Sequence, residues 1–244
     1  MTHRADKMED YTSRKEERTS SSINKEEEEA KEEYESKIDT RGTKESEKQL
    51  LIQESALLKP YRIEVFAAVV DLLNTMKIKW WISDGTLLGW YRNNQSMLPH
   101  DYDMDIGVTE DDIQAVWKNR AKLPTNIELQ NVSSKKLAAY HLELPPEPES
   151  GTFFWLAPTD IISYQKEATR DIWHCNFDVN GMHLSYSEFP NDVLFPLVES
   201  KFEGVSVYVP QKPKEYLEIL YGYIGEDAVW DPATNKYKKK NDDA

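Results

Sequence analysis

The sequence has little cysteine: Cys175 is the single cysteine in 244 residues. One thiol excludes an internal disulfide framework and any zinc site built from several cysteines of the same chain. Long apolar runs are also missing, because no stretch approaches the roughly 18 consecutive apolar residues that a membrane-spanning helix requires. Residues 1–20 contain no apolar run of the kind found in signal peptides. We therefore expect no membrane span, signal peptide or anchor in this sequence, and the compartment stays open.

Positive charge is scarce as well. Lysine and arginine number 30 against 44 aspartates and glutamates, which gives a formal net charge of −14 at pH 7. Long contact with a nucleic-acid backbone needs clustered lysine and arginine to displace counterions, so we expect no nucleic-acid partner. A small substrate that is carried together with divalent cations suits an acidic protein better.

Aliphatic side chains are scarce in residues 1–50, which contain a serine run at 20–22 and a glutamate block at 26–29. Such a composition cannot bury enough apolar area to offset the entropy of ordering, so we predict a disordered acidic tail over residues 1–50. Residues 25–35 within it have the composition of a solvated helix. The remaining length suits one catalytic domain, expected over residues 51–236, with a frayed C-terminus over 237–244.

The pattern of apolar residues indicates the elements of this domain. Pro60 is followed by apolar residues at spacings of three and four as far as Met76, which predicts an amphipathic helix with the proline in its first turn. Residues 79–83 form a short aromatic and β-branched run that stops before Gly85, as a strand meeting a glycine turn does. Further elements are expected as a helix from Thr86, a strand over 101–106, a helix over 111–120, strands over 127–132, 152–164 and 205–209, and a helix over 214–221. Together they predict an α+β fold with a mixed β-sheet flanked by helices.

Two segments carry residues suited to chemistry, and the first is S-D-G-T-L-L-G-W-Y-R at 83–92. Here a predicted strand delivers Gly85 and Thr86 to the N-terminus of a predicted helix. Free backbone N–H groups and the helix dipole favour a phosphate at that position, and glycine lets the backbone come close to it. The segment therefore predicts a phosphate site.

The second segment, P-H-D-Y-D-M-D-I-G at 99–107, spaces three acids with period two. On a strand, Asp101, Asp103 and Asp105 would share one face, and such crowding of carboxylates is unfavourable without a cation. Hard oxygen ligands call for Mg²⁺ or Mn²⁺, and two such ions can clamp the oxygens of a phosphoryl transfer. Asp160, an isolated acid in a later apolar strand, is expected to join this metal site.

The order of these features resembles that of the nucleotidyltransferase superfamily, which includes DNA polymerase β. A narrower resemblance, over residues 60–232, is to the LicD/fukutin family, whose usual motifs are D-G-T-L-L-G-x-x-R and P-W-D-D-D-I-D. This sequence differs at His100, which replaces the usual tryptophan, and at Tyr102, which replaces the middle aspartate. The resemblance implies a nucleotidyltransferase, polymerase β-like fold, and relatives that work in the Golgi or secretory pathway.

The resemblance also implies an activity: transfer of a phosphorylated alcohol, such as ribitol phosphate or phosphocholine, from a CDP-linked donor to a hydroxyl of a glycan or glycoprotein acceptor, with release of CMP. In that scheme Asp103 and Asp105 bind Mg²⁺ or Mn²⁺, and Asp160 binds metal or takes the acceptor's proton. Asp101 either provides a further ligand or orients the strand. The implied substrate contacts are Gly85, Thr86, Arg92 as a bidentate phosphate clamp, and His100; Arg92 is equally suited to a surface ion pair.

Other interpretations of the acids are open. A calcium loop of the EF-hand type would need glycine and glutamate where Ile106 and Asp112 stand, so that interpretation is disfavoured. Among enzymes, plain nucleotidyl transfer with pyrophosphate as the leaving group would use the same residues. A glycan-binding protein that keeps the fold without turnover is the alternative outside enzymology.

Overall fold

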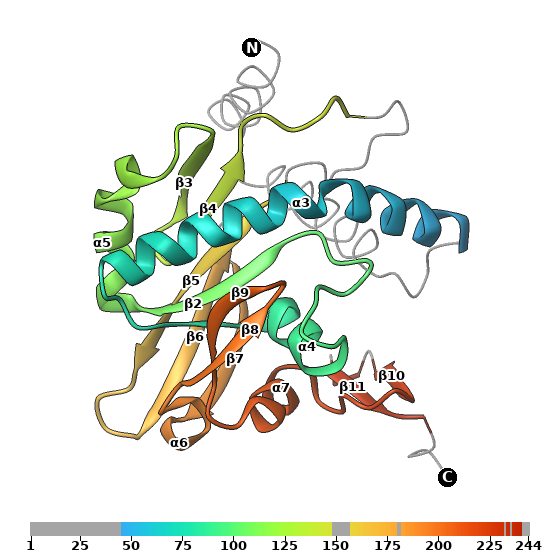
Figure 1. Cartoon of the computed structure of the whole chain (residues 1–244). Helices are drawn as coiled ribbons and strands as arrows, with labels where there is room; N and C mark the ends of the chain where they lie inside the picture. Colours follow the sequence, from blue (N-terminus) through green and yellow to red (C-terminus); the bar gives the residue numbers. More distant parts are fainter. Residues whose placement is uncertain (1–44, 148–156, 180–181, 232, 235, 241–244) are drawn as a thin grey trace, which may run out of the picture. The chain divides into compact units, whose positions relative to one another are not determined.

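A computed structural model describes residues 45–147, 157–179, 182–231, 233–234 and 236–240 (Figure 1). The chain divides into two compact units, residues 1–50 and 51–244. Residues 45–50 are the described part of the first unit and begin helix α3 (Glu45–Thr75). Most of the predicted acidic tail, including the helical composition at 25–35, lies outside the described residues.

Seven strands of the described chain form one mixed sheet. Its path runs β1 (Trp80–Ile82), β2 (Met104–Thr109), β5 (Thr159–Lys166), β4 (Lys136–His141) and β3 (Ile127–Ser133), while β6 (Ile172–Val179) pairs with β5 and with β7 (Met182–Pro190). Strands β2 and β5 are parallel, and the other pairs of the sheet are antiparallel. The predicted α+β class with a mixed sheet is confirmed.

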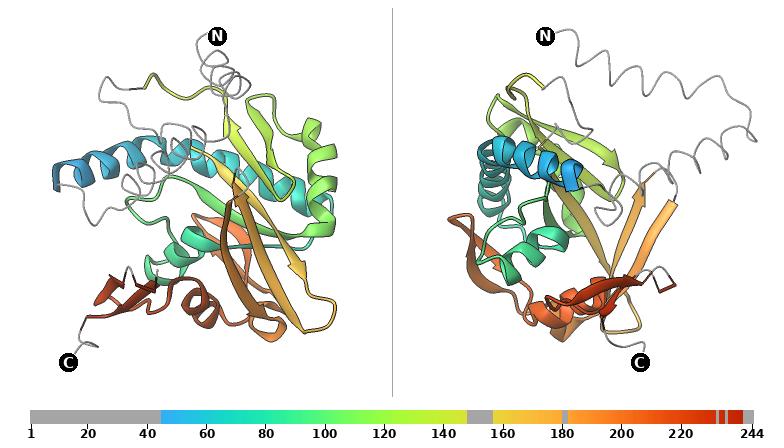
Figure 2. Two further views of the ribbon diagram at one scale, coloured as in Figure 1. Left: turned by 180° about the vertical axis from the view of Figure 1, so that it is seen from behind. Right: turned by 90° about the vertical axis from the view of Figure 1, so that its right-hand side faces the viewer.

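Helices and two short hairpins complete the described chain. The helices after α3 are α4 (Asp84–Arg92), α5 (Glu110–Lys118), η1 (Arg120–Lys122), α6 (Asn191–Leu194) and α7 (Pro213–Tyr221). The hairpins are β8 (Val198–Phe202) with β9 (Val205–Val209), and β10 (Ala228–Asp231) with β11 (Lys236–Lys239). Helix α4 packs against β2 and α7, and α7 packs against β7. The part of α3 from residue 51 onward runs across one face of the sheet (Figures 1 and 2).

The core explains why α3 takes this position. Val65, Phe66, Val69 and Leu73 repeat at helical spacing and are all fully buried in one cluster with the strand residues of β1 and β2. The helix starts at Glu45, earlier than predicted, and it runs through Pro60 instead of beginning there. Loss of one backbone hydrogen bond at a proline is tolerated where apolar packing on both sides holds the helix together.

The start of β2 also differs from the prediction. The strand begins at Met104, so Asp105 lies in it, whereas Asp101 and Asp103 lie in the extended segment that leads to it. Residues 104–108 of β2 are all buried, so neither face of this strand is exposed to solvent. Alternating acids are compatible with an extended segment as well as with a strand, and the sequence pattern does not separate the two.

The boundaries of other strands and helices agree with the sequence-based predictions in some places and differ in others. Strand β9 coincides with the predicted 205–209, and α7 ends at Tyr221 and is followed by the C-cap Gly222, whose φ of 77° glycine adopts without strain. The expected frayed end from residue 237 differs from the structure, where Lys236–Lys239 pairs with β10. Strands β4, β6 and β7 were not predicted, and residues 152–156 of the predicted strand 152–164 lie outside the described residues.

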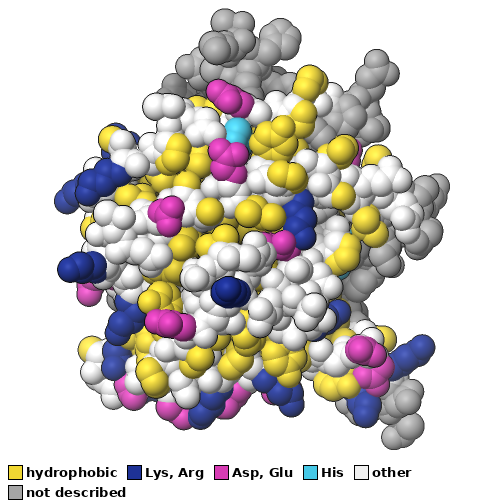
Figure 3. Space-filling view, viewed as in Figure 1, with side chains coloured by type: hydrophobic (Ala, Val, Ile, Leu, Met, Phe, Trp, Pro, Cys, Tyr) yellow, Lys and Arg dark blue, Asp and Glu magenta, His cyan; other side chains and the backbone are white. Residues whose placement is uncertain are grey.

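The face of the described chain that Figure 3 shows carries charges of both signs among hydrophobic side chains. Within the described residues, no helix combines the length and the apolar character that a membrane crossing demands.

Gly107 gives a test of the packing that holds β1 on β2. It pairs directly with Trp81, and a Cβ at this position would lie 2.4 Å from the indole ring. Gly107→Ala should therefore lower the free energy of unfolding by about 1 to 3 kcal/mol, measured by urea denaturation. The cost should shrink in a Trp81→Phe background, because the smaller ring relieves the overlap. An equal cost in both backgrounds would show that the predicted overlap does not exist.

Candidate functional site

Three carboxylates meet at the adjoining ends of β2 and β5. Asp103, Asp105 and Asp160 each place an oxygen so that these atoms lie within 4.8 Å of one another. The parallel register sets Asp105 beside Asp160, and Asp103 precedes them in the segment leading into β2. Asp105 and Asp160 are 7% and 6% exposed. The structure thus brings together three of the acids selected from the sequence.

Asp101 lies next to this cluster without belonging to it among the described residues. Its backbone oxygen accepts hydrogen bonds from Ser55 Oγ at 2.6 Å and from an Arg62 nitrogen at 3.2 Å. Its own carboxylate accepts the backbone N–H of Tyr102 at 3.2 Å. A Cβ on Gly85 would lie 3.0 Å from Asp101 Oδ2, so the glycine turn lies directly against this carboxylate.

Arg62 is a residue of the site region that the sequence analysis did not select. It is 1% exposed, on the buried face of α3, and donates to both the backbone oxygen and the hydroxyl of Ser55. Burial lowers the pKa of Arg62 to about 10, although Asp101 and Asp103 favour its charged form. The signal was available, because an arginine at helical spacing between Leu58 and Phe66 falls on the apolar stripe.

Burial disfavours the charged forms of Asp101, Asp103, Asp105 and Asp160, and repulsion by neighbouring carboxylates adds to this effect at Asp103 and Asp105. Burial, followed by the neighbouring carboxylates, raises the pKa of Asp103 and of Asp105 well above the usual range. Burial raises the pKa of Asp101 to about 6. Burial also raises the pKa of Asp160, against the opposing effect of Lys136. A divalent cation would relieve this repulsion, and three convergent carboxylates are the hard oxygen donors that Mg²⁺ and Mn²⁺ prefer.

Lys136 is a second residue that the sequence analysis missed. Its ammonium forms an ion pair with Asp160 Oδ2, and its side chain is 14% exposed. Strand β4 pairs antiparallel with β5 so that Ala138 lies opposite Asp160, and Lys136 is on the same face of the sheet two residues away. Burial opposes the charged form of Lys136, but the ion pair and hydrogen bond with Asp160, together with the charges of Asp105 and Asp103, outweigh burial and raise the lysine's pKa. No sequence pattern pointed to Lys136, because β4 itself was not predicted.

Helix α4 begins beside the acids. The hydroxyl of Thr86 accepts the backbone N–H of Asp105 at 2.7 Å, which ties the first turn of α4 to β2. The Thr86 side chain is buried, and its contact with substrate stays a prediction. Ser83 is the N-cap residue, and Asp84 is the first helical residue, with a φ of 44°.

The two other predicted substrate contacts lie at the edges of this region. Arg92 is exposed in the last turn of α4, at the opposite end of the helix from Gly85. His100 is exposed and directly precedes Asp101. The structure gives neither side chain a described contact with the three clustered acids.

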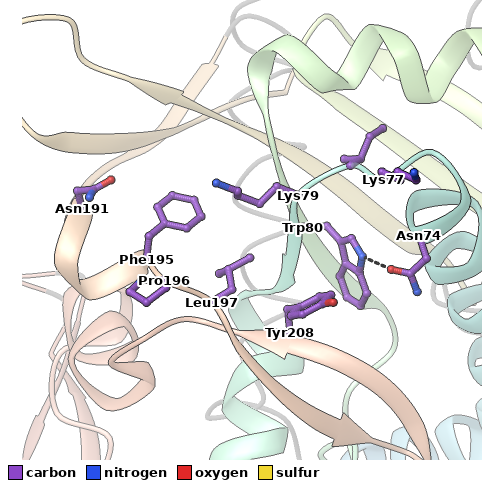
Figure 4. Close-up of a pocket in the computed structure, with 10 residues that line it drawn as sticks. Asn74, Lys77, Lys79, Trp80, Asn191, Phe195, Pro196, Leu197 and Tyr208 are labelled. Atoms are coloured by element: carbon purple, nitrogen blue, oxygen red, sulfur yellow. Dashed lines mark hydrogen bonds between the residues drawn. The ribbon is translucent and has the colours of Figure 1, made fainter.

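A pocket of about 690 Å³ lies at the other end of β1 (Figure 4). Trp80 lines it and pairs with Val108, roughly 10 Å along β2 from Asp105 at 3.3 Å per residue. Asn74 accepts the indole N–H of Trp80 at 2.9 Å at the rim, and Lys77 and Lys79 also line the pocket. None of the predicted site residues lines this pocket, so it is separate from the acid cluster.

Comparison with known families and proteins identifies relatives. Residues 77–212 match the family described as LicD/FKTN/FKRP, nucleotidyltransferase domain, and all three clustered acids lie in that range. The uncharacterized protein RT0683 of Rickettsia typhi is 29% identical over 156 residues, covering 62% of this chain and 42% of the relative. The human ribitol-5-phosphate transferase FKTN is 27% identical over 175 residues, covering 69% of this chain and 34% of the relative.

The human ribitol 5-phosphate transferase FKRP is 25% identical over 162 residues, covering 63% of this chain and 30% of the relative. The chain thus spans less than half the length of these curated relatives. Among solved structures, the lincomycin-bound lincosamide antibiotic adenylyltransferase LnuA is 15% identical and covers 70% of this chain and 89% of that chain. Its TM-score of 0.40 is too low to carry an argument.

The raised pKa of Asp101 gives a pH test on the metal-free protein. In the unfolded chain this group titrates near 3.8 and in the folded chain near 6, so the folded state binds more protons between those values and loses stability as the pH rises through 6. Asp101→Asn removes that loss. In a chelator-containing buffer, thermal melts should show Asp101→Asn equal to wild type near pH 4 and more stable by roughly 1 to 3 kcal/mol at pH 7.5. Asp171→Asn, an exposed control, should show no such gain; destabilisation by Asp101→Asn at pH 7.5 would contradict the assignment.

Proposed function

This chain belongs to the LicD/FKTN/FKRP family, and from that premise we propose that it is a transferase of phosphorus-containing groups with a nucleotidyltransferase, polymerase β-like fold. It moves a phosphorylated alcohol, of the ribitol phosphate or phosphocholine type, from a CDP-linked donor to a hydroxyl of a glycan or glycoprotein. The observation that carries the proposal is the meeting of Asp103, Asp105 and Asp160 beside the N-terminal turn of α4.

The acid cluster is the proposed metal site. Asp103, Asp105 and Asp160 would hold Mg²⁺ or Mn²⁺ through oxygens that already lie within 4.8 Å of one another. The bound ion supplies charge stabilisation for the oxygens of the phosphoryl group that is transferred. Asp101 fits the role of orienting the segment, because its backbone oxygen is fixed by Ser55 and Arg62 while its carboxylate faces Gly85.

The N-terminal turn of α4 is the proposed site for donor phosphate. Gly85 brings the backbone close to the acids, and the unpaired N–H groups that begin any helix favour an anion there. Thr86 fixes this turn to β2 through its bond to the Asp105 N–H. Contacts of Arg92 and His100 with substrate stay predictions, and both side chains are exposed at the edge of the region.

The proposed reaction is a single displacement at phosphorus. The acceptor hydroxyl oxygen forms a bond to the phosphorus of the alcohol phosphate, and the bond from that phosphorus to the bridging oxygen of the diphosphate breaks. CMP leaves with the bridging oxygen and the electron pair of the broken bond. The hydroxyl proton passes to a carboxylate, and Asp160 is the candidate for this role.

The activity test compares products and variants. Wild-type protein with Mg²⁺, a CDP-alcohol and an acceptor glycan should release CMP, and Asp103→Asn or Asp105→Asn should lower kcat by at least about a hundredfold without lowering the melting temperature. Asp171→Asn, exposed and remote from the cluster, is the matched control and should keep full turnover. Unchanged turnover in both site variants would overturn the proposal, and pyrophosphate released from CTP would establish nucleotidyl transfer in its place.

Donor identity can be tested by stabilisation. A true donor binds the folded state and raises the melting temperature by mass action, so CDP-ribitol, CDP-choline or CDP-glycerol at a hundred times its Kd should add about 2.7 kcal/mol of stability. The shift should require Mg²⁺ and vanish on chelation, because the diphosphate and the carboxylates otherwise repel each other. A shift that persists undiminished in excess chelator would argue against metal-assisted donor binding.

A further inference from the structure

We propose that Lys136 is an exchangeable counter-ion of the site: its ammonium neutralises Asp160 in the metal-free protein and moves to the donor diphosphate when a divalent cation takes Asp160. This inference rests on the proposed function and adds a residue that recognises the diphosphate. It also explains why a lysine lies in a cluster that must bind metal.

The first step is the contact itself. The ammonium of Lys136 pairs with Asp160 Oδ2, one of the three carboxylates whose oxygens converge. An ammonium is a compact cation that donates hydrogen bonds to the same lone pairs a metal ion would use. While this pair persists, Lys136 therefore occupies part of the coordination that Asp160 offers.

The second step compares the two cations near the acids. Arg62 is 1% exposed, and its guanidinium is held by Ser55 and by the backbone of Asp101. Lys136 is more exposed, at 14% of its side chain, and carries its charge on a flexible stem of four carbons. Of these two, Lys136 is the cation that can change partners without breaking the fold.

The third step concerns charge balance once substrate binds. A divalent ion bound by Asp103, Asp105 and Asp160 neutralises their negative charge. Lys136 is then no longer needed to neutralise Asp160. The donor diphosphate then brings new negative charge to the same place. Lys136 lies on the sheet face that Asp160 shares, so its released ammonium is within reach of an anion bound there.

The experiment measures metal and diphosphate binding without turnover. Lys136→Met keeps an unbranched side chain one atom shorter than lysine and removes the charge. Titration of the full chain with Mn²⁺ alone, followed by the electron paramagnetic resonance signal of free Mn²⁺, should give about tenfold tighter binding than wild type because the competing cation is gone. Titration with CDP at saturating Mg²⁺ should give about tenfold weaker binding, because the anion has lost a partner.

Matched variants make the result specific. Lys136→Arg retains the charge and should leave Mn²⁺ affinity near that of wild type. Lys166 is on the same strand as Asp160, and its ammonium pairs with Asp171 at 2.8 Å. Lys166→Met should therefore leave the affinities for Mn²⁺ and for CDP unchanged. Lys136→Gln repeats the comparison if Lys136→Met does not fold, as judged by circular dichroism.

Two outcomes overturn the inference. Mn²⁺ affinity that is unchanged or weaker in Lys136→Met would mean that metal and ammonium share Asp160 without competition. CDP affinity that is unchanged in the metal-loaded variant would mean that Lys136 does not contact the diphosphate. Neither measurement depends on catalysis, so failure of the wild-type transfer assay would overturn the proposed function separately.

Discussion

Repulsion between buried carboxylates is the constraint on which the rest of this structure depends. Asp103, Asp105 and Asp160 converge at the ends of two parallel strands, and burial makes each of their negative charges unfavourable. A protein that needed only stability would not bring such groups together, because separate exposed positions are better solvated. The fold instead holds them there beside the cations Lys136 and Arg62, in an arrangement of carboxylates suited to a metal ion.

The surrounding elements are arranged to keep this unfavourable cluster in place. Thr86 ties α4 to the backbone of Asp105, and Ser55 ties α3 to the backbone of Asp101. On the other side, the hydroxyls of Tyr164 and Tyr216 lie 2.6 Å apart, which joins β5 to α7 near its centre. The first two bonds hold backbone atoms of Asp105 and Asp101, so they position these residues without using their carboxylates.

The residues that sequence patterns identified are those whose signal is local. Asp103 and Asp105 stand in one short motif, and Asp160 is an acid isolated in an apolar strand, so each could be found without knowledge of the fold. Period-two spacing could not tell that β2 begins only at Met104, because an extended segment alternates in the same way. Lys136 was missed because its importance comes from strand pairing with Asp160, and that contact exists only in three dimensions.

The parallel pairing of β2 with β5 has a consequence for how the protein acquires its site. The strands are neighbours in the sheet, but α5, β3 and β4 lie between them along the chain. A ligand set completed by such distant segments has high contact order, and its closure carries a large entropic barrier. During synthesis, therefore, a nascent chain that has emerged only as far as β4 holds an incomplete cage. The three carboxylates therefore come together only when β5 pairs with β2, so the proposed metal site forms only in the folded domain.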